Sequence, residues 1–223
     1  MLRIVAVADT HAFESHIERV PDGDILIHAG DLSRSGALEE FRDAVAWVKS
    51  LPHPHKIVIA GNHDWSLVHH REAALELLHG LTYLEDSGCQ IDGVNFWGSP
   101  WTPEFCDWAF NLPRGPQLAE KWALIPAETD VLITHGPPHG YGDRVHVQRR
   151  CGCDDLLVAL DRVRPALHVF GHIHEDGGCW QRGETLIANV TTWGPLRPPT
   201  VFDYDPASRT VVPIVVPARN PVV

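Results

Sequence analysis

Five short clusters of metal-ligand residue types follow five apolar runs in this 223-residue sequence. The runs are rich in valine and isoleucine, which is typical of buried strands. Imidazole, carboxylate and amide groups can bind divalent metal ions. Because the carboxyl ends of strands in an α/β sheet face one crevice, we expect the five clusters to meet there. The clusters are Asp9-Thr10-His11, Gly30-Asp31, Gly61-Asn62-His63-Asp64, Thr134-His135-Gly136 and Gly171-His172-Ile173-His174.

Each cluster taken alone also has a simpler structural interpretation. Asp-Thr-His after a strand is typical of a helix N-cap or a turn, and Gly-Asp is a common turn dipeptide. His135 alone is more typical of a buried core histidine. His172 and His174 flank one residue, so on extended backbone they share a face. The repetition of five such signals in one structural position favours a shared site over five unrelated turns.

The elements that must position these clusters alternate along the first two-thirds of the chain. Periodicity predicts nine strands, too many for one small sheet, and four helices, so the fold class is α/β, with two sheets packed together and flanked by helices. The predicted helices are 38–49, 67–78, 118–124 and 154–163. The predicted strands are 3–8, 25–29, 56–60, 94–97, 131–134, 167–170, 186–190, 200–204 and 210–216.

Composition limits the class of protein and of partner. The length and the absence of a linker predict one domain over residues 1–223. The formal net charge of −11 argues against general binding to nucleic acid or to an anionic membrane. Five cysteines without regular spacing predict no disulfide framework, and no apolar run has the length of a membrane span or a signal peptide. We therefore expect a cytoplasmic protein, whose oligomeric state the sequence leaves open.

The order of the five clusters resembles the calcineurin-like metallophosphoesterase superfamily over nearly the whole chain. The stretches 98–101, 134–138 and 168–175 resemble more narrowly its metallophosphoesterase-domain-containing branch, called the 239 family. The resemblance implies a four-layer α-β-β-α sandwich that carries a binuclear metal site. It also implies these roles: Asp9, His11 and His174 hold one metal, Asn62, His135 and His172 hold the other, Asp31 bridges both, and His63 stands near the leaving-group oxygen, steered by Asp64.

The implied activity is hydrolysis of phosphate esters by attack of metal-bound hydroxide. The two metals would neutralise phosphate oxygens and acidify a bound water. Mixed imidazole and oxygen ligands favour transition metals, with Mn first and Fe, Zn, Co or Ni as alternatives, over Ca or Mg alone. His63 is the general-acid candidate. The branch resemblance favours phosphodiesters, including cyclic nucleotides, over monoesters, so the expected partner is a small phosphate-ester substrate such as a nucleotide.

Other interpretations stay open or fail at particular residues. A catalytically weak scaffold that keeps the fold is the alternative from another class. A metallo-β-lactamase motif fails where Gly177 stands in place of histidine. Three tryptophans, Trp101, Trp108 and Trp193, could stack a base, although tryptophans in such positions are more often core or loop residues. Arg34 or His139 could contact substrate. Cys151 and Cys153 are expected to serve packing.

Overall fold

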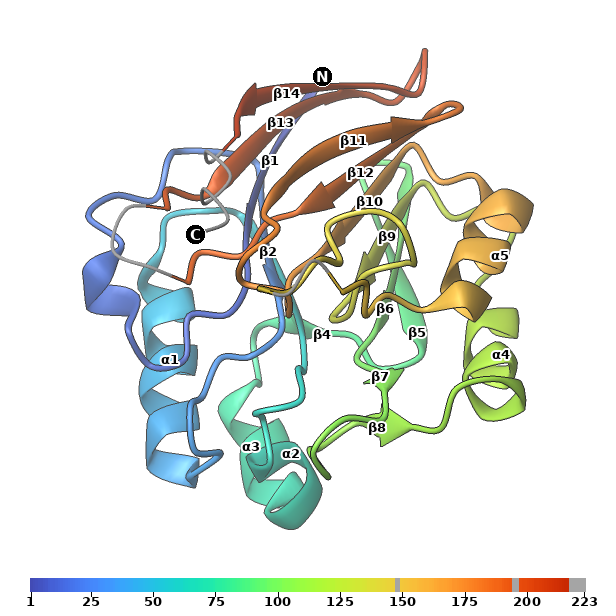
Figure 1. The fold of residues 1–223 in the computed structure, drawn as a ribbon. Coiled ribbons are helices and arrows are strands. Elements are labelled where there is room, and N and C mark those ends of the chain that lie inside the picture. Colours follow the sequence, from blue (N-terminus) through green and yellow to red (C-terminus); the bar gives the residue numbers. More distant parts are fainter. Residues whose placement is uncertain (147–148, 194–196, 217–223) are drawn as a thin grey trace.

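The structure, a computed structural model, describes residues 1–146, 149–193 and 197–216. Two mixed six-stranded sheets pack face to face, with helices on both outer sides (Figure 1). The predicted fold class is therefore confirmed. The first sheet has the order β14-β13-β1-β2-β3-β4. Its strands are β1 (Leu2–Val7), β2 (Ile25–Ala29), β3 (His55–Ile59), β4 (Thr82–Tyr83), β13 (Thr200–Asp205) and β14 (Thr210–Val215).

The second sheet has the order β11-β12-β10-β9-β6-β5. Its four central strands run parallel, whereas the two edge strands are antiparallel to their neighbours. A small two-stranded ladder of β7 (Thr102–Pro103) and β8 (Asn111–Leu112) lies apart from both sheets. The strands of the second sheet are β5 (Ser87–Ile91), β6 (Val94–Ser99), β9 (Val131–Thr134), β10 (Leu167–Phe170), β11 (Gly178–Arg182) and β12 (Thr185–Asn189).

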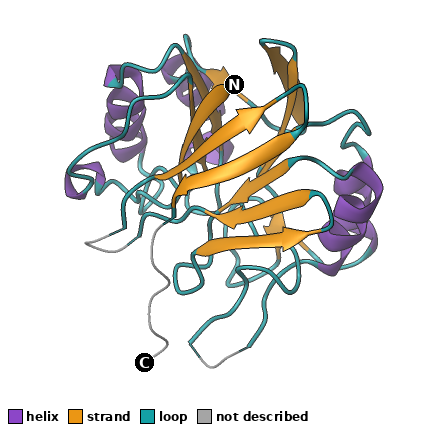
Figure 2. Ribbon diagram, turned by 90° about the horizontal axis from the view of Figure 1, so that it is seen from above, coloured by secondary structure: helices purple, strands orange, loops and turns teal. Residues whose placement is uncertain are grey.

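Helices form the two outer layers, as the view from above shows (Figure 2). Apolar residues of α1, α2 and α3 pack on the first sheet, and those of α4 and α5 pack on the second. The helices are α1 (Leu38–Ser50), α2 (Ser66–His69), α3 (Arg71–Leu77), α4 (Pro116–Ala123) and α5 (Asp154–Val163), with a short 3-10 helix η1 at Glu14–His16. Within the described residues, no helix has the length and apolar character needed to cross a membrane.

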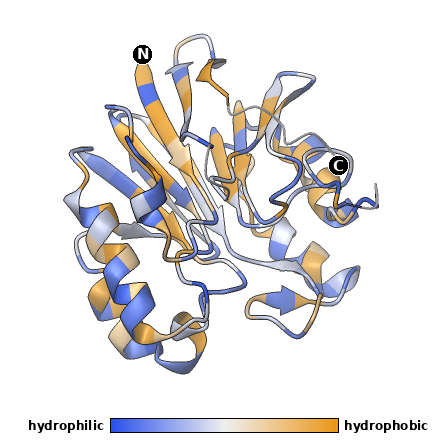
Figure 3. Cartoon of the chain, turned by 60° about the vertical axis from the view of Figure 1, so that its left-hand side comes forward, coloured by the Kyte–Doolittle hydropathy of each residue, from blue (hydrophilic) through white to orange (hydrophobic). Residues whose placement is uncertain are grey.

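The central core lies between the sheets and is built from the inward-facing residues of both. Ile27, Ile59, Ile133 and Phe202 are among its fully buried members. Hydrophobic colour follows the strands, whereas the helices carry it on one side only (Figure 3). Burial on both faces explains why these strands have nearly continuous apolar runs and were recognisable in the sequence.

Two predictions about elements need correction. The predicted helix over 67–78 is two helices, because His70 leaves the helical region with φ −129° and ψ 40°. The nine predicted strands are present, but β4, β5, β7, β8 and β11 were not predicted. Strands β5 and β11 have the sequences SGCQI and GCWQR, with few β-branched residues, and each lies at a sheet edge with one side unpaired. The prediction of one domain extends to residues 217–223, which lie outside the described residues.

Candidate metal centre

The seven predicted ligands lie together where the carboxyl ends of strands from both sheets meet. Backbone contacts join the two sheets at this edge: Ala8 forms a parallel bridge with Thr191, and Thr192 donates to the carbonyl of Ala8 through its amide (2.9 Å) and its hydroxyl (2.7 Å). The ligands follow five strands: Asp9 and His11 after β1, Asp31 after β2, Asn62 after β3, His135 after β9, and His172 and His174 after β10.

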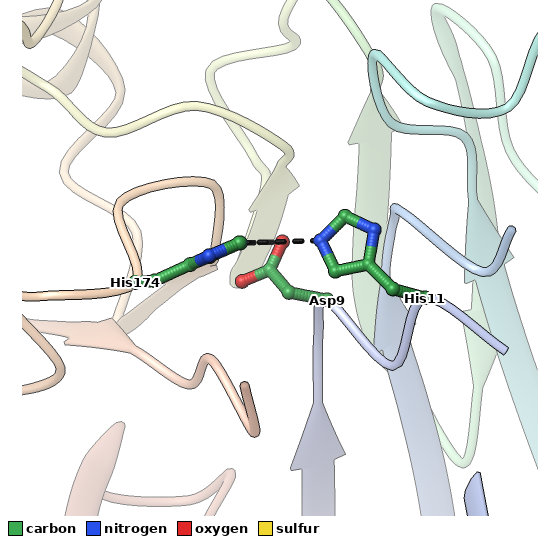
Figure 4. Close-up of side chains that lie close together, drawn as sticks. All are labelled: Asp9, His11 and His174. Carbon is green, nitrogen blue, oxygen red and sulfur yellow. Dashed lines mark hydrogen bonds and ion pairs between the residues drawn. The ribbon is translucent and has the colours of Figure 1, made fainter. Parts of the chain in front are cut away.

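Asp9, His11 and His174 form a group that we call the outer corner (Figure 4). The Nε2 atoms of His11 and His174 are 3.2 Å apart, and Nε2 of His174 is 4.0 Å from Oδ1 of Asp9. The side chain of His174 is 28% exposed, whereas Asp9 is completely buried. The outer corner therefore opens toward solvent on the side of His174.

Asp31, Asn62, His135 and His172 form a second group, the inner corner. Nε2 of His135 lies 2.9 Å from Oδ1 of Asn62 and 3.3 Å from Oδ2 of Asp31. The same Asp31 oxygen is 3.7 Å from Nε2 of His11 in the outer corner. Asp31 thus stands between the corners, where a carboxylate shared by two ions would stand.

In two of these histidines, His11 and His135, a backbone carbonyl holds the other ring nitrogen. Nδ1 of His135 donates to the carbonyl of Ala29 at 2.9 Å, and Nδ1 of His11 donates to that of Ser33 at 3.3 Å. A carbonyl only accepts, so Nδ1 carries the proton and Nε2 faces the site, which is the usual arrangement of metal-binding histidines.

The donor set fits divalent transition ions. The 3.2 Å separation of the two Nε2 atoms in the outer corner suits two ligands that are each about 2.0–2.1 Å from one ion. In each corner, histidine and carboxylate ligand atoms lie within 4.8 Å of one another. These clusters are where divalent ions would bind in this chain.

Close packing shifts the pKa values of the buried ligands in opposite directions. Burial raises the pKa of Asp31, but the neighbouring imidazoles, His135 foremost, outweigh it and leave the pKa of Asp31 well below its ordinary value. Burial lowers the pKa of His135, but Asp31 overcomes this and raises it to about 9. Burial lowers the pKa of His172 to about 3 and also lowers that of His11. The carboxylate of Asp31 therefore favours the protonated form of His135.

Four ligands have left-handed backbone, which costs non-glycine residues free energy. The φ angles are 58° at Asp9, 47° at His11, 58° at Asp31 and 70° at His172. Such conformations cost on the order of 1–3 kcal/mol each and persist only where surrounding structure fixes them. Their concentration at one edge indicates that the fold gives up stability to direct these side chains inward.

Two glycines make room for the ligands. A Cβ atom at Gly61 would lie 2.3 Å from the amide nitrogen and from Oδ1 of Asp31, and 2.7 Å from Cε1 of His135. A Cβ atom at Gly171 would lie 2.6 Å from Oδ2 of Asp9. Real Cβ contacts are essentially never this short, so a larger residue at position 61 or 171 would displace the side chains of the corner beside it.

Asp64 holds together the two loops that carry Asp31 and Asn62. Its carboxylate accepts hydrogen bonds from the amides of Asp31 (3.0 Å), Ser33 (2.9 Å) and Gly61 (2.8 Å), and from the Ser33 hydroxyl (2.8 Å). The steering of His63 by Asp64 stays a prediction. Nδ1 of His63 donates to the carbonyl of Arg34 at 2.7 Å, so Asp64 would act on His63 through the loop backbone.

His63 lies beside the metal ligands with its ring enclosed by aromatic neighbours. Its amide donates to Oδ1 of Asp31 at 2.8 Å, and its ring centroid is 4.6 Å from that of His11. The indole of Trp108 lies against the ring, with centroids 4.1 Å apart and planes 31° apart. Sequence analysis named Trp108 as a base-stacking candidate but missed this contact, because Trp108 belongs to a distant loop.

A cavity of about 490 Å³, which we call the main cavity, opens onto the inner corner. Asp31, Asn62, His63 and His172 are among its lining residues. Phe105, Trp108, Arg114, Arg149, Cys151 and Glu175 extend its walls away from the ligands. This volume falls within the range of small-molecule sites, so the ligands lie where a substrate could reach them.

Several other sequence candidates lie away from that cavity. Trp101 donates from Nε1 to Oδ2 of Asp86 at 2.9 Å and anchors a loop. His139 forms an ion pair with Asp154 at 3.0 Å. Cys153 is buried and accepts a hydrogen bond from Trp122, so its predicted packing role agrees with its surroundings.

Arg34 and Trp193 lie near the outer corner instead. The guanidinium of Arg34 is 5.6 Å above the centroid of the Phe13 ring. The indole of Trp193 stacks on His174, with ring centroids 5.2 Å apart and planes 29° apart. Trp193 therefore supports a ligand ring directly.

Comparisons with known proteins agree with this geometry. The sequence profile described as calcineurin-like phosphoesterase matches residues 2–176. The chain is 42% identical over 230 residues to human metallophosphoesterase domain-containing protein 1, covering 90% of this chain and 70% of the human one. It is 41% identical over 203 residues to a UPF0046 protein of Caenorhabditis elegans, covering 85% of this chain and 69% of that one. A crystal structure of the Thermus thermophilus protein TT1561 has the same fold, with a TM-score of 0.66 at 14% identity over 95% of this chain and 97% of that one.

Proposed function

The chain belongs to the calcineurin-like phosphoesterase family, and we propose that it hydrolyses phosphate esters, with phosphodiesters preferred over monoesters. One observation carries the proposal: the carboxylate of Asp31 stands between two groups of ligands, 3.7 Å from Nε2 of His11 and 3.3 Å from Nε2 of His135. A scaffold protein would have no use for two adjoining ligand groups that cost backbone strain to build.

The proposed ligand sets follow the two corners. Asp9, His11 and His174 would hold one ion, Asn62, His135 and His172 the other, and Asp31 both. Two divalent ions bound there would neutralise phosphate oxygens and acidify a bound water, which is the chemistry that ester hydrolysis needs. Mn is our first choice of metal, with Fe, Zn, Co and Ni as alternatives, because imidazole and oxygen ligands are mixed.

Few ligands are charged, and this explains how an acidic protein attracts phosphate. Of the seven proposed ligands only Asp9 and Asp31 are carboxylates, so their charge of −2 offsets only half of the charge of two divalent ions. The local field at the site then favours an anion although the chain carries −11 overall. A small phosphate-ester substrate is the partner that we propose.

His63 is proposed as the general acid that protonates the leaving oxygen. Its Nδ1 is committed to the carbonyl of Arg34, so Nε2 is the nitrogen that can give up a proton toward the main cavity. Trp108 limits rotation of the ring from one side. Asp64 fixes the position of the His63 backbone by holding the loops that flank it.

The walls of the main cavity support an organic diester as substrate. Beyond the ligands lie the exposed side chains of Phe105 and Arg149 and the indole of Trp108. An aromatic and cationic surface of this kind accommodates a base and a second phosphate substituent. Arg114 has a different task, because its guanidinium donates to the carbonyls of Cys151 and Gly152, both at 2.7 Å. Nucleotide diesters, including cyclic nucleotides, are the proposed class, and the predicted cytoplasmic location stays a prediction.

The test is a metal-reconstitution panel. The protein, stripped with a chelator, is loaded separately with Mn, Fe, Zn, Co and Ni and assayed on bis(p-nitrophenyl) phosphate and p-nitrophenyl phosphate. We expect the diester to be hydrolysed faster, with Mn among the activating ions. Asp31→Asn should abolish turnover, whereas the matched exposed change Asp43→Asn should not.

Two results would overturn the proposal. Stable folding with no bound metal and no turnover under any of these ions would favour the scaffold alternative. Faster hydrolysis of the monoester would keep the phosphoesterase and remove its diester preference.

A further inference from the structure

A second cavity, of about 340 Å³, lies on the other side of the outer corner. Its lining includes Phe13, His16, Ile17, Trp193 and Arg197, and it reaches Asp9 at its inner end. Neither His63 nor any ligand of the inner corner is among the residues that line it. The second cavity is therefore separate from the main cavity, although both adjoin the metal centre.

Arg197 is the unusual member of this wall. It is only 7% exposed, and all three nitrogens of its guanidinium are closed off from solvent. None of the three has a hydrogen-bond partner within the part of the chain that the structure describes. An arginine cannot lose its charge at physiological pH, so this group is a desolvated cation with unused donors.

The surroundings of Arg197 show that its position is part of the fold. A Cβ atom at Gly177 would lie 2.1 Å from Nη1 of Arg197, so only glycine leaves room for the guanidinium there. Burial lowers the pKa of Arg197, while the charges of Asp9, Glu175 and Asp176 raise it without hydrogen bonding to it. The carboxylate of Asp9 is engaged elsewhere, because both of its oxygens accept from the amide of His172 at 3.0 Å.

The rest of the wall is apolar and aromatic. Phe13 and Trp193 meet edge to face, with ring centroids 5.6 Å apart, and His16 stacks on Phe13 at 5.3 Å. Such a surface suits a flat or branched apolar body. A buried guanidinium next to it suits a planar anionic group, which two parallel N–H donors can bind.

We propose that the second cavity binds a small organic anion, an aromatic or branched apolar body with one carboxylate or phosphoryl group, whose anionic group pairs with Arg197. The far end of the Arg197 side chain turns from Gly177 toward the anion as it binds. Ions at the outer corner would strengthen this binding, because they offset the charge of Asp9. The ligand does not compete for the main cavity.

The test measures binding without turnover, so it is independent of the proposed hydrolysis. Metal-loaded protein is titrated calorimetrically with benzoate, phenylphosphonate and the neutral analogue benzamide. We expect the two anions to bind and benzamide to bind far more weakly, and the stronger anion identifies the carboxylate or the phosphoryl source.

Four variants locate the site. Arg197→Met should weaken anion binding by about 10- to 100-fold, the loss expected for hydrogen bonds to a charged group. Arg197→Lys should retain part of the affinity. Gly177→Ala should bind the anions at least as tightly as the unmodified protein does, because its Cβ fills the space that the guanidinium leaves on binding. The matched control Arg149→Met, in the main cavity, should bind both anions as the unmodified protein does.

Three outcomes would overturn the proposal: no anion binding by the unmodified protein, equal binding by Arg197→Met, or an equal loss in Arg149→Met. The last would place the anion in the main cavity. Should Arg197→Met fail to fold, the other two variants decide the question, because an unchanged affinity in Arg197→Lys or a weaker affinity in Gly177→Ala would overturn the proposal.

Discussion

The inner and outer corners of the metal centre use the same residue types but differ in how firmly they are held. In the inner corner His135 is completely buried, its Nδ1 donates to Ala29, and its Nε2 contacts Asn62 and Asp31. In the outer corner His174 is 28% exposed and rests against Trp193. Buried hydrogen bonds to Ala29 and Asn62 hold His135, whereas His174 rests against the exposed indole of Trp193. One site can therefore combine a firmly held histidine with a less firmly held one.

His63 belongs to neither corner as a proposed ligand, so removing it should leave both intact. We expect His63→Ala to keep its full metal content and to lose about 10²- to 10⁴-fold in rate on esters with basic leaving groups, because proton donation is lost. Esters with good leaving groups should lose much less. Metal analysis and kcat on a pair of such esters check this, with His139→Ala as the control. Unchanged turnover of the basic-leaving-group ester would remove His63 from the chemistry.

Single ligand removals should separate the two corners. His135→Ala should lower the affinity for the ion in the inner corner by more than about 100-fold. Removal of a residue that only hydrogen-bonds to a metal ligand costs up to about 100-fold in affinity, and here the proposed ligand itself is lost. His174→Ala should lower the affinity for the ion in the outer corner by a smaller factor, because water can replace the imidazole at this exposed position. Titration calorimetry with Mn on both variants measures the two affinities. Equal losses would show that exposure does not distinguish the corners.

Alanine at the two crowded glycines should destabilise the corners unequally. Gly61→Ala meets both Asp31 backbone and His135, and overpacking of this kind costs about 1–3 kcal/mol of unfolding free energy. Gly171→Ala meets the Cβ of Ala8 at 2.5 Å and the Asp9 carboxylate at 2.6 Å, contacts that are slightly longer than those at Gly61 and involve no backbone atom. Urea unfolding of both variants should rank Gly61→Ala as the less stable. The control is Gly136→Ala, whose Cβ would meet the side chain of Thr102 at 3.0 Å.

The pH dependence of metal binding should differ between the corners. The pKa of His135 is raised to about 9 in the protein without ions, so below that pH a proton competes with the inner ion. Affinity should be level above pH 9 and fall by about tenfold for each pH unit below it. Burial lowers the pKa of His11, so the outer ion should not displace a proton from that ring near neutral pH. Calorimetry in buffers of different ionisation enthalpy counts the released protons, and equal release at both corners would contradict the assignment.

Sequence reasoning selected seven side chains that the structure brings together, because strand ends carry a strong signal. An apolar run followed by Asp, Asn or His marks both an element and its functional end, and parallel strands bring such ends to one edge. The edge strands β5 and β11 gave no such signal, since neither SGCQI nor GCWQR contains a continuous apolar run.

The contacts between loops could not be read from the sequence. Asp64 is adjacent to His63 in the chain, yet its carboxylate turns to the loop of Asp31 and Ser33. Arg197 gave no sequence signal at all, because only folding encloses a single arginine among apolar neighbours. Contacts of this kind depend on which loops meet in the folded chain, and the local sequence pattern does not encode which loops meet.

Backbone and side-chain contacts join the two sheets at the end of the sandwich that carries the proposed ligands. Ala8 bridges to Thr191, Thr192 donates twice to Ala8, and His135 donates across to Ala29. Transient opening of the sandwich at this end would break these contacts and is therefore costly, so amide exchange should be slow around Ala8 and Ala29. The opposite end is joined as well, because Arg209, in the turn between β13 and β14, pairs with Asp130 and donates to the carbonyl of Arg164 at 3.2 Å.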